Sequence, residues 1–281
     1  RRDGTSRLSP DNRWSTFPSV AAGWRVSDEA FFNSSLISNL KLRANHGTLG
    51  SANIGYWDYQ QRINTFPTIA IGTDQHIEGA ATNVQLANNN LRWETLTQSN
   101  FGVDLGFFDD KLTATAEYYI STTDDVLTQA PIAITTGNDG GNPFVNAASL
   151  RNTGFEFTIS YAEAAKEFKY NTSLNITTIK NEVLSLGYDR NDIYVGNTVT
   201  EVGSPIGMWY VLETDGLFQG PEDVLNYKND EGQVIQPNAQ PGDIRFVDHN
   251  GDGQITNDDK VVMGSPWADV EIGWNFNASY K

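Results

Sequence analysis

Cysteine is absent from the 281 residues, and histidine occurs only at His46, His76 and His249. Without cysteine the chain has neither a disulfide framework nor a thiolate metal site. The three histidines stand in unlike sequence contexts, so a histidine-based zinc site or catalytic triad is not expected. We therefore predict that the chain is not an enzyme.

Long apolar runs are also missing. No stretch approaches the roughly 20 apolar residues that a transmembrane helix needs, which excludes a helical membrane protein. The first residues, RRDGTSRLSP, lack the apolar core of a signal peptide. We therefore expect either a cytoplasmic protein or a longer chain that begins upstream of Arg1.

Basic residues are few: 19 Lys and Arg stand against 35 Asp and Glu, which gives a formal net charge of -16 and a pI near 4.4. Nucleic acids and anionic membrane surfaces attract basic patches. Neither is expected as a partner, and the charge favours cations or neutral ligands.

The chain is rich in aromatic residues, Thr, Asn and Gly, and few stretches have apolar residues at helical spacing. Together these features predict an all-β protein. The segment KLTATAEYYI alternates strictly, with one apolar and one polar face, as the two-residue period of a strand requires. NFGVDLGFF alternates in the same way, and the tight turn DDK joins the two segments into a hairpin. The other segments that alternate are FPSVAAGWRV, NLKLRANH, FEFTISY, FKYNTSLNITTI and DVEIGWNFNASY, so we predict seven strands.

The connections between these strands alternate in length. The connections after residues 27, 107 and 161 are short, and those after residues 49, 120 and 179 are long. In an up-and-down antiparallel sheet this places all short turns at one end, as in bacterial outer-membrane barrels. Aromatic residues also lie near the short turns, where a membrane-interface girdle is expected: Trp24, Phe31, Phe32, Phe107, Phe108, Tyr161 and Phe168.

Two folds fit this pattern. A transmembrane barrel turns the apolar face outward to lipid, whereas a soluble sandwich or barrel buries it, and alternation alone does not distinguish the two. We favour the membrane barrel because soluble β-domains seldom combine strands of this length with long loops at only one end of the sheet. Seven strands leave two unpaired edges, which lipid does not tolerate, so we expect part of a larger barrel.

Several segments together resemble a known family: RRDGTSRLSPDNRWSTFPSVAAGWRVSDEAFF, LKLRANHGTLG, LRWETLTQSNFGVDLGFFDDKLTATAEYY, NTGFEFTIS, GSPIGMWYVLETDGLFQ and QPGDIRFVDHNGDGQITNDDKVVMGSP. In this order they resemble the C-terminal half of the barrel of SusC/RagA-type TonB-dependent transporters. The resemblance covers nearly the whole chain, and residues 240–266 carry its most specific part. Residues 1–281 are thus expected to belong to a single TonB-dependent receptor β-barrel domain.

The resemblance implies a barrel of 22 strands with a plugged lumen in the outer membrane of a Gram-negative cell. It implies contact with outer-membrane lipid, a SusD-like surface lipoprotein over the extracellular side, and energy from a TonB-type protein. The substrate would be glycan oligosaccharides or, as a second possibility, peptides. The signal peptide, the TonB-contacting segment, the plug, the first barrel strands and the closing strands have no counterpart here, so transport is expected only from a larger protein.

The segment DHNGDGQITNDD, within the expected extracellular loop 240–266, has the spacing of an EF-type calcium loop. Such a loop takes oxygen ligands from its first, third, fifth, seventh and twelfth positions and has glycine at the sixth. The flanking segments GDIRFV and KVVMG indicate strands rather than helices, so a paired EF-hand is not expected. We predict a structural Ca²⁺; the alternative is an acidic turn held by its own side-chain hydrogen bonds. The five expected ligands are Asp248, Asn250, Asp252, the carbonyl of Gln254, and Asp259.

Four aromatic residues in or beside this longest loop are candidates for stacking on sugar rings: Trp209, Tyr210, Phe218 and Trp267. Packing of the loop on itself or on the lipoprotein explains them equally well. The second candidate for the whole chain is a soluble, calcium-stabilised β-domain that binds carbohydrate.

Overall fold

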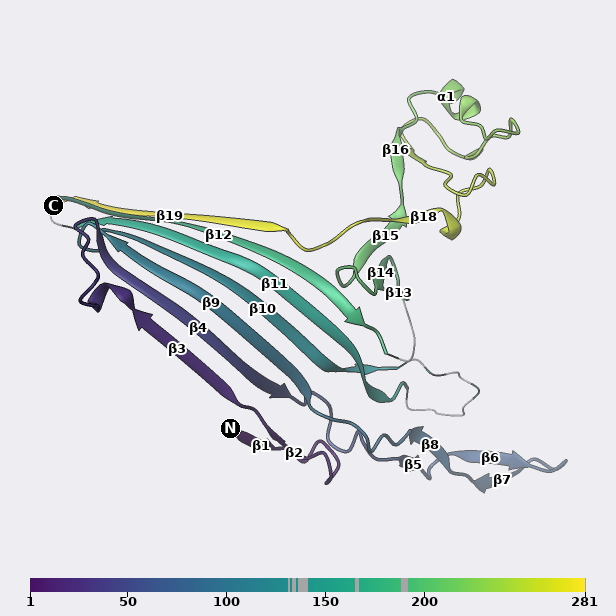
Figure 1. The fold of residues 1–281 in the computed structure, drawn as a ribbon. Coiled ribbons are helices and arrows are strands. Elements are labelled where there is room, and N and C mark those ends of the chain that lie inside the picture. Colours follow the sequence, from purple (N-terminus) through teal and green to yellow (C-terminus); the bar gives the residue numbers. More distant parts are fainter. Residues whose placement is uncertain (131, 133–134, 136–140, 165–166, 188–191, 281) are drawn as a thin grey trace. The chain divides into compact units, whose positions relative to one another are not determined.

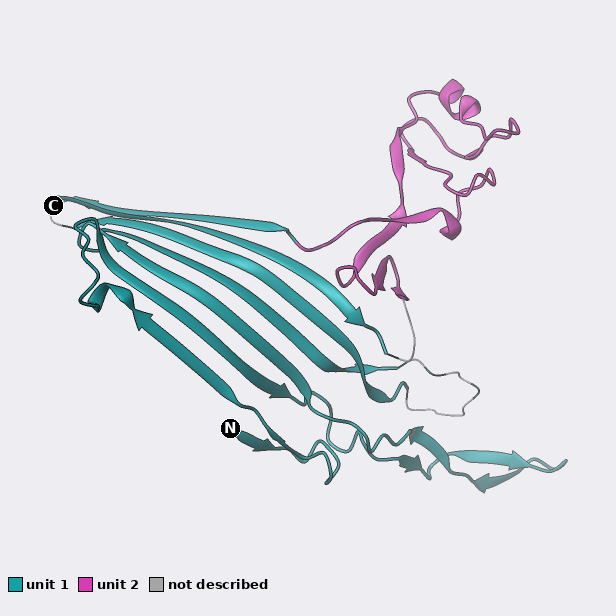
Figure 2. Ribbon diagram, in the orientation of Figure 1, with its two compact units in different colours: residues 1–190, 268–281 teal, residues 191–267 magenta. Residues whose placement is uncertain are grey.

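A computed structural model describes the chain except residues 131, 133–134, 136–140, 165–166, 188–191 and 281. It divides into two compact units (Figure 2): unit 1 comprises Arg1–Arg190 with Ala268–Lys281, and unit 2 comprises Asn191–Trp267. No helix in the described ranges has both the length and the apolar character to cross a membrane. Each unit is described by itself, and the assignment of both to one barrel domain stays a prediction.

Unit 1 is built on one antiparallel sheet of seven strands (Figure 1). Neighbours in the sheet follow one another in chain order, so the topology is up-and-down. This confirms all seven predicted strands and their order. The strands, from one edge to the other, are β3 (Ser19–Arg25), β4 (Ile37–Ser51), β9 (Glu94–Phe107), β10 (Leu112–Gln129), β11 (Phe144–Glu163), β12 (Phe168–Ser185) and β19 (Val270–Tyr280).

Figure 1 shows the short connections at one end of this sheet and the long ones at the other. The first long connection, β4 to β9, carries two small hairpin pairings, β5 (Arg62–Asn64) with β8 (Thr82–Gln85) and β6 (Thr68–Ile71) with β7 (His76–Gly79). Most of the predicted turn AEAAKE is described, but residues 165–166 of it are not.

The long connection that was predicted to begin directly after residue 120 begins later and is shorter. β10 continues to Gln129 and β11 begins at Phe144, so much of this segment is strand that projects past the apolar band. The pairing of β10 with β11 shifts register between Thr123 and Val126, and Asp125 adopts a φ of 56°. The sequence pattern ends at Ile120 because residues 121–125 are all polar, and the bulge that follows shifts the two-residue period.

The apolar side chains of the sheet do not form a core. On interior strands of the sheet, Phe101 is 55% exposed and Tyr118 45% exposed, whereas the charged side chain of Glu117 on the opposite face is 21% exposed. Because soluble proteins cover apolar rather than polar side chains, this distribution contradicts a soluble sandwich and fits a barrel wall that faces lipid. On β10 the apolar stretch Leu112–Ile120 has about the length with which a tilted strand crosses a bilayer.

Polar groups on this apolar face have local partners. The indole Nε1 of Trp274 donates to Oγ1 of Thr172 at 2.9 Å, and that hydroxyl donates to the backbone oxygen of Asn275 at 3.1 Å. Satisfying each donor within the wall is what a lipid environment demands.

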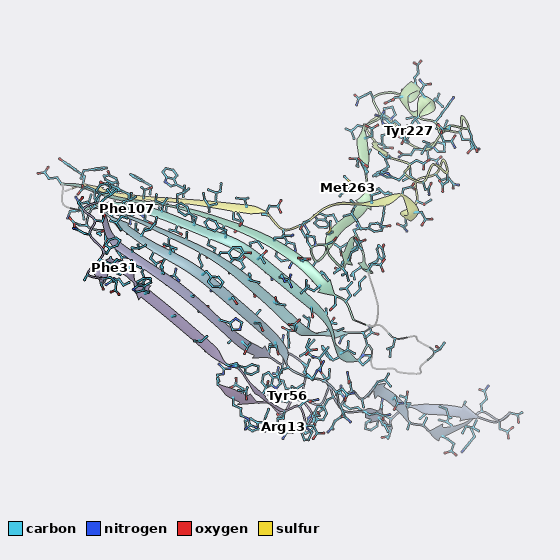
Figure 3. All side chains as sticks on the ribbon, in the orientation of Figure 1. Arg13, Phe31, Tyr56, Phe107, Tyr227 and Met263 are labelled. Atoms are coloured by element: carbon cyan, nitrogen blue, oxygen red, sulfur yellow. The ribbon has the colours of Figure 1, made fainter. Side chains whose placement is uncertain are left out.

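Aromatic rings gather near the short turns, where Figure 3 labels Phe31 and Phe107. The ring centroids of Trp24 and Phe31 are 6.4 Å apart, and those of Tyr161 and Tyr170 are 5.8 Å apart. Their position matches the predicted girdle.

A small apolar core lies at the long-loop end of unit 1. Leu8, Ile54, Tyr59 and Leu91 are buried together, with Trp93 and Phe144 packed against them. In the N-terminal segment, which contributes Leu8 to this core, β1 (Arg2–Gly4) pairs with β2 (Trp14–Thr16). This core fixes the segments that precede β9 and begin β11.

Unit 2 has two sheets. One contains β13 (Asp192–Val195), β14 (Thr198–Glu201), β15 (Met208–Leu212) and β18 (Lys260–Gly264), and the other pairs β16 (Thr214–Leu217) with β17 (Ile244–Phe246). A short helix α1 (Pro221–Asn226) and a single 3₁₀ turn η3 (Asn257–Asp259) complete it. The predicted strands on either side of the acidic loop are confirmed as β17 and β18.

Candidate functional site

The acidic loop of unit 2 is organised by side-chain hydrogen bonds to its own backbone. The carboxylate of Asp248 accepts from the N–H of Gly251 at 2.7 Å and from that of Gly253 at 2.8 Å. Asn250 Oδ1 accepts from the N–H of Asp252, and Asp252 Oδ1 accepts from the N–H of Gln254, each at 2.8 Å. Gly251 and Gly253 adopt φ values of 75° and 81°, a region that favours glycine.

Asp259, at the twelfth position, is fully buried. Burial alone would raise its pKa, but N–H donors from Thr256, Asn250 and His249 outweigh that cost, and the pKa lies below its ordinary value. Its Oδ2 accepts from the N–H of Thr256 at 2.7 Å, which forms a capping box with the Thr256 side chain at the start of η3. Asp259 therefore holds the loop closed through its own hydrogen bonds.

Four of the five predicted ligand residues thus lie in one set of tight turns: Asp248, Asn250, Asp252 and Gln254. The fifth, Asp259, accepts hydrogen bonds from the N–H groups of His249 and Asn250. Within the described residues no group of three or more His, Cys, Asp or Glu side chains is arranged to hold a metal ion. Each carboxylate oxygen of Asp259 already accepts two hydrogen bonds, whereas each oxygen of Asp248 accepts one and retains a second lone pair. The calcium site stays a prediction.

The four candidate aromatic residues differ in what they offer a ligand. Phe218 is 1% exposed and packs edge-on against Tyr227, so almost no ring surface remains for a sugar. Tyr210 lies 5.0 Å from the ring of Tyr194. Trp209 and Trp267 are exposed, and Trp267 Nε1 donates to the backbone oxygen of Ile206 at 3.1 Å. No shared aromatic platform joins these four among the described ring contacts.

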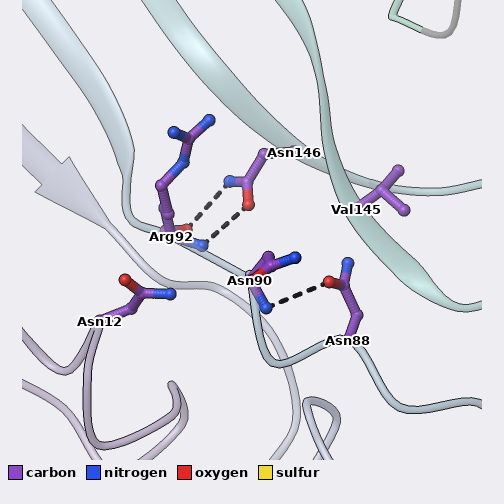
Figure 4. Close-up of a pocket in the computed structure, with 6 residues that line it drawn as sticks. All are labelled: Asn12, Asn88, Asn90, Arg92, Val145 and Asn146. Carbon is purple, nitrogen blue, oxygen red and sulfur yellow. Dashed lines mark hydrogen bonds between the residues drawn. The ribbon is translucent and has the colours of Figure 1, made fainter.

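A polar cavity of about 460 Å³ lies in unit 1 and was not predicted from the sequence. We call it the asparagine pocket (Figure 4); Asn12, Asn88, Asn90, Arg92, Val145 and Asn146 line it. These residues come from the N-terminal segment, from the segment before β9 and from the start of β11. The run of asparagines at 88–90 is the signal in the sequence that could have indicated it.

The polar face of the sheet carries an ion network. Arg43 on β4 donates to both carboxylate oxygens of Asp104 on β9, at 2.9 and 3.1 Å, and to Glu117 on β10 at 3.0 Å. Gly102 on β9 lies between Arg43 and Glu117 in the register, and a Cβ there would be 2.9 Å from Arg43 Nη2. The absence of a side chain at Gly102 lets the guanidinium cross β9.

The same cross-strand row continues with acidic residues. Glu117 pairs with Glu156, Glu156 with Thr177, and Thr177 with Glu271. The register shows that these three glutamates share one row on the polar face. Carboxylates directly opposite each other destabilise a sheet, and Arg43 offsets part of that repulsion.

Carboxamides occupy the neighbouring rows toward the long loops. A cavity of about 440 Å³ is lined in part by Asn45, Gln98 and Asn100, and Gln98 Nε2 donates to Asn100 Oδ1 at 2.9 Å. In the row of Gln98 lie Asn152 on β11 and Asn181 on β12, joined by a hydrogen bond of 2.7 Å. Neutral side chains thus line the wall beyond the charged row.

Comparison with known proteins agrees with this geometry. The family model described as TonB dependent receptor-like, beta-barrel matches residues 1–280. The TonB-dependent receptor SusC of Bacteroides thetaiotaomicron is 33% identical over 296 residues, which cover 100% of this chain and 28% of SusC. The TonB-dependent receptor P39 of Formosa agariphila is 34% identical over 318 residues, covering 100% of this chain and 29% of that protein.

Among solved structures, the RagAB peptide transporter has the same fold, with a TM-score of 0.78 at 22% identity over 100% of this chain and 29% of that chain. The chain therefore spans somewhat over a quarter of the length of the relatives that it matches. Residues 1–280 match the family model, and the seven-stranded sheet exposes its apolar face. Both curated relatives are named TonB-dependent receptors. The chain belongs to the TonB-dependent receptor β-barrel family and is of the SusC/RagA type.

Proposed function

We propose that this chain forms part of the wall and the extracellular loops of an outer-membrane importer that takes up glycan oligosaccharides. The observation that carries the proposal is the exposed apolar face of the sheet opposite a polar face of ions and carboxamides. A wall of this kind separates lipid from a hydrated interior. The whole protein would act as an active transporter in the outer membrane of a Gram-negative cell, without catalysing a reaction.

The partners of the whole protein belong to the proposal. A SusD-like surface lipoprotein would deliver the substrate from the extracellular side, and a TonB-type protein would supply energy through parts outside these residues. Membership of the SusC/RagA type supports both partners, and the relative SusC is itself named a TonB-dependent receptor.

Glycans are preferred as the substrate because carboxamides contribute to both cavities of unit 1 described above, and the arginines of their linings are paired, Arg92 with Asp125 and Arg1 with Asp3. The net charge of -16 disfavours anionic substrates. Peptides are the second candidate, since RagAB is described as a peptide importer. At 22% identity that likeness concerns the fold and does not decide between the two substrates.

A structural Ca²⁺ in the acidic loop is also part of the proposal. The full set of oxygen residues at EF-type spacing supports it, together with lone pairs that the backbone hydrogen bonds leave free. The ion would stiffen unit 2 and take no part in transport.

Deletion of the gene in its own organism tests the proposed function. The deletion strain is expected to lose growth on one class of glycan, and reintroduction of the gene is expected to restore it. Purification of the full-length protein from the outer membrane is expected to bring a surface lipoprotein with it. Undiminished uptake of every glycan by the deletion strain would contradict the proposal, and loss of growth on peptides alone would favour the second candidate.

A further inference from the structure

We propose that the asparagine pocket is a binding subsite for a neutral, hydroxyl-rich ligand, a single sugar residue of a glycan. This inference rests on the proposed function and names the place where the substrate would first be held by this chain.

Two asparagines fix the walls of the pocket. Asn146 Oδ1 accepts from the N–H of Arg92 at 2.8 Å, and its Nδ2 donates to the backbone oxygens of Arg92 at 3.0 Å and Asp125 at 2.8 Å. Asn88 Nδ2 donates to the backbone oxygen of Phe144 at 2.8 Å. These bonds tie the segment before β9 to β10 and β11, so the cavity is preformed.

Two other asparagines keep hydrogen-bonding capacity. In the described part of the chain, the side chain of Asn90 is exposed and makes no hydrogen bond, although its backbone N–H donates to Asn88 Oδ1. Asn12 Nδ2 donates to the backbone oxygen of Asn89 at 3.2 Å, which leaves its Oδ1 available. A carboxamide presents donors and an acceptor together, as a pair of neighbouring sugar hydroxyls also does.

The pocket is electrically neutral. Arg92 supplies its one cationic side chain, and Nη2 of Arg92 lies 2.8 Å from Oδ1 of Asp125. An anionic ligand would have to compete with Asp125 for this guanidinium and to approach a chain of net charge -16. The pocket therefore favours an uncharged ligand.

The lining also distinguishes sugars from peptides. Val145 is the one apolar residue of the lining, and it is buried at 5% exposure. Apolar peptide side chains bind against accessible apolar walls, and the lining offers none. A ligand that is polar on all sides meets only carboxamides and a guanidinium here.

A second set of carboxamides lies farther along the same strands. β9 begins at Glu94, directly after the pocket, and carries Gln98 and Asn100; β11 begins beside the pocket and carries Asn152. A row of apolar side chains, Leu96, Leu150 and Val183, lies between the pocket and these carboxamides. A ligand that leaves the pocket would cross this row before it meets carboxamides again.

Binding to the full-length transporter, purified in detergent with its lipoprotein partner, tests the proposal. The probes are neutral α-glucan, β-glucan, fructan and xylan oligosaccharides, acidic pectic oligosaccharides, and a pool of short peptides. We compare wild type with Asn90→Ala and, as matched control, Asn33→Ala, an exposed asparagine near the short-turn end. Asn90→Ala is expected to raise the Kd for one neutral glycan roughly five- to tenfold by loss of one or two hydrogen bonds, and Asn33→Ala to leave it unchanged.

The outcomes separate this inference from the proposed function. An unchanged Kd of Asn90→Ala for the bound glycan would overturn the subsite while gene-dependent glycan uptake still supported the importer. Binding of peptides or acidic oligosaccharides in place of neutral glycans would also overturn the subsite. Glycan uptake that persists in the deletion strain would instead contradict the proposed function.

Discussion

Arg43 on β4 reaches across β9 and donates to the carboxylate of Glu117 on β10 at 3.0 Å, while it also binds both oxygens of Asp104. The three side chains are less than a third exposed. Charge-assisted, bidentate bonds of this kind join three neighbouring strands of the wall on its polar face.

The first prediction concerns the strength of this link. Arg43→Met is expected to lower the free energy of unfolding of the barrel by about 1–3 kcal/mol, because it leaves two partly covered carboxylates without their cation. In a double-mutant cycle with Glu117→Gln, we expect a coupling of about 1 kcal/mol. Urea unfolding of the full-length protein in lipid or detergent measures both quantities.

Gly102→Val provides the control for this cycle, since it places a side chain in the path of Arg43 toward Glu117. The variant is expected to remove the Arg43–Glu117 coupling and to leave the Arg43–Asp104 pair in place. A cycle that shows no coupling in the wild-type background would mean that the network does not stabilise the wall.

A second prediction separates packing from ligand contact among the loop aromatics. Phe218→Ala is expected to destabilise unit 2 by about 3–5 kcal/mol, because the buried ring leaves a cavity beside Tyr227. Trp209→Ala is expected to change stability little, since its side chain is exposed. Limited proteolysis of the 191–267 segment in the full-length protein compares the two variants, and equal cleavage would refute the distinction.

A third prediction concerns calcium. Adding Ca²⁺ is expected to slow proteolysis of the loop at residues 248–259, and Asp248→Asn with Asp252→Asn is expected to abolish that effect. Asp259→Asn is expected to speed cleavage with or without Ca²⁺, because its carboxylate accepts the backbone donors that close the loop. Equal cleavage of the wild type with calcium and with a chelator would contradict the calcium site and favour the alternative, a turn held only by its own hydrogen bonds.

The sequence predicted the strands wherever side-chain alternation was continuous. It lost β10 past Ile120 because residues 121–125 are all polar and show no alternation, and the bulge near Asp125 then shifts the period. It could not give the register, so the crossing of Arg43 over Gly102 and the shared row of Glu117 and Glu156 were not foreseeable.

The candidate site shows the same limit. Spacing along the chain identified the acidic loop because all its ligand residues are local. The asparagine pocket is assembled from three distant segments, so the run of asparagines at 88–90 indicates only part of it, and no local pattern gives the residues that complete it. Composition also could not tell that Phe218 is buried while Trp209 is exposed, since both are aromatic residues of one long loop.

The orientation of β10 tests the central claim most directly. The 281 residues contain no cysteine, so once any cysteine elsewhere in the full-length protein is replaced, single cysteines can be introduced at Thr113, Ala114, Thr115, Ala116, Glu117 and Tyr118 and labelled in outer-membrane vesicles. A small, water-soluble maleimide is expected to label positions 113, 115 and 117, and to leave positions 114, 116 and 118 unlabelled because they face lipid. Labelling of the even positions with protection of the odd ones, or labelling of both sets alike, would contradict the account.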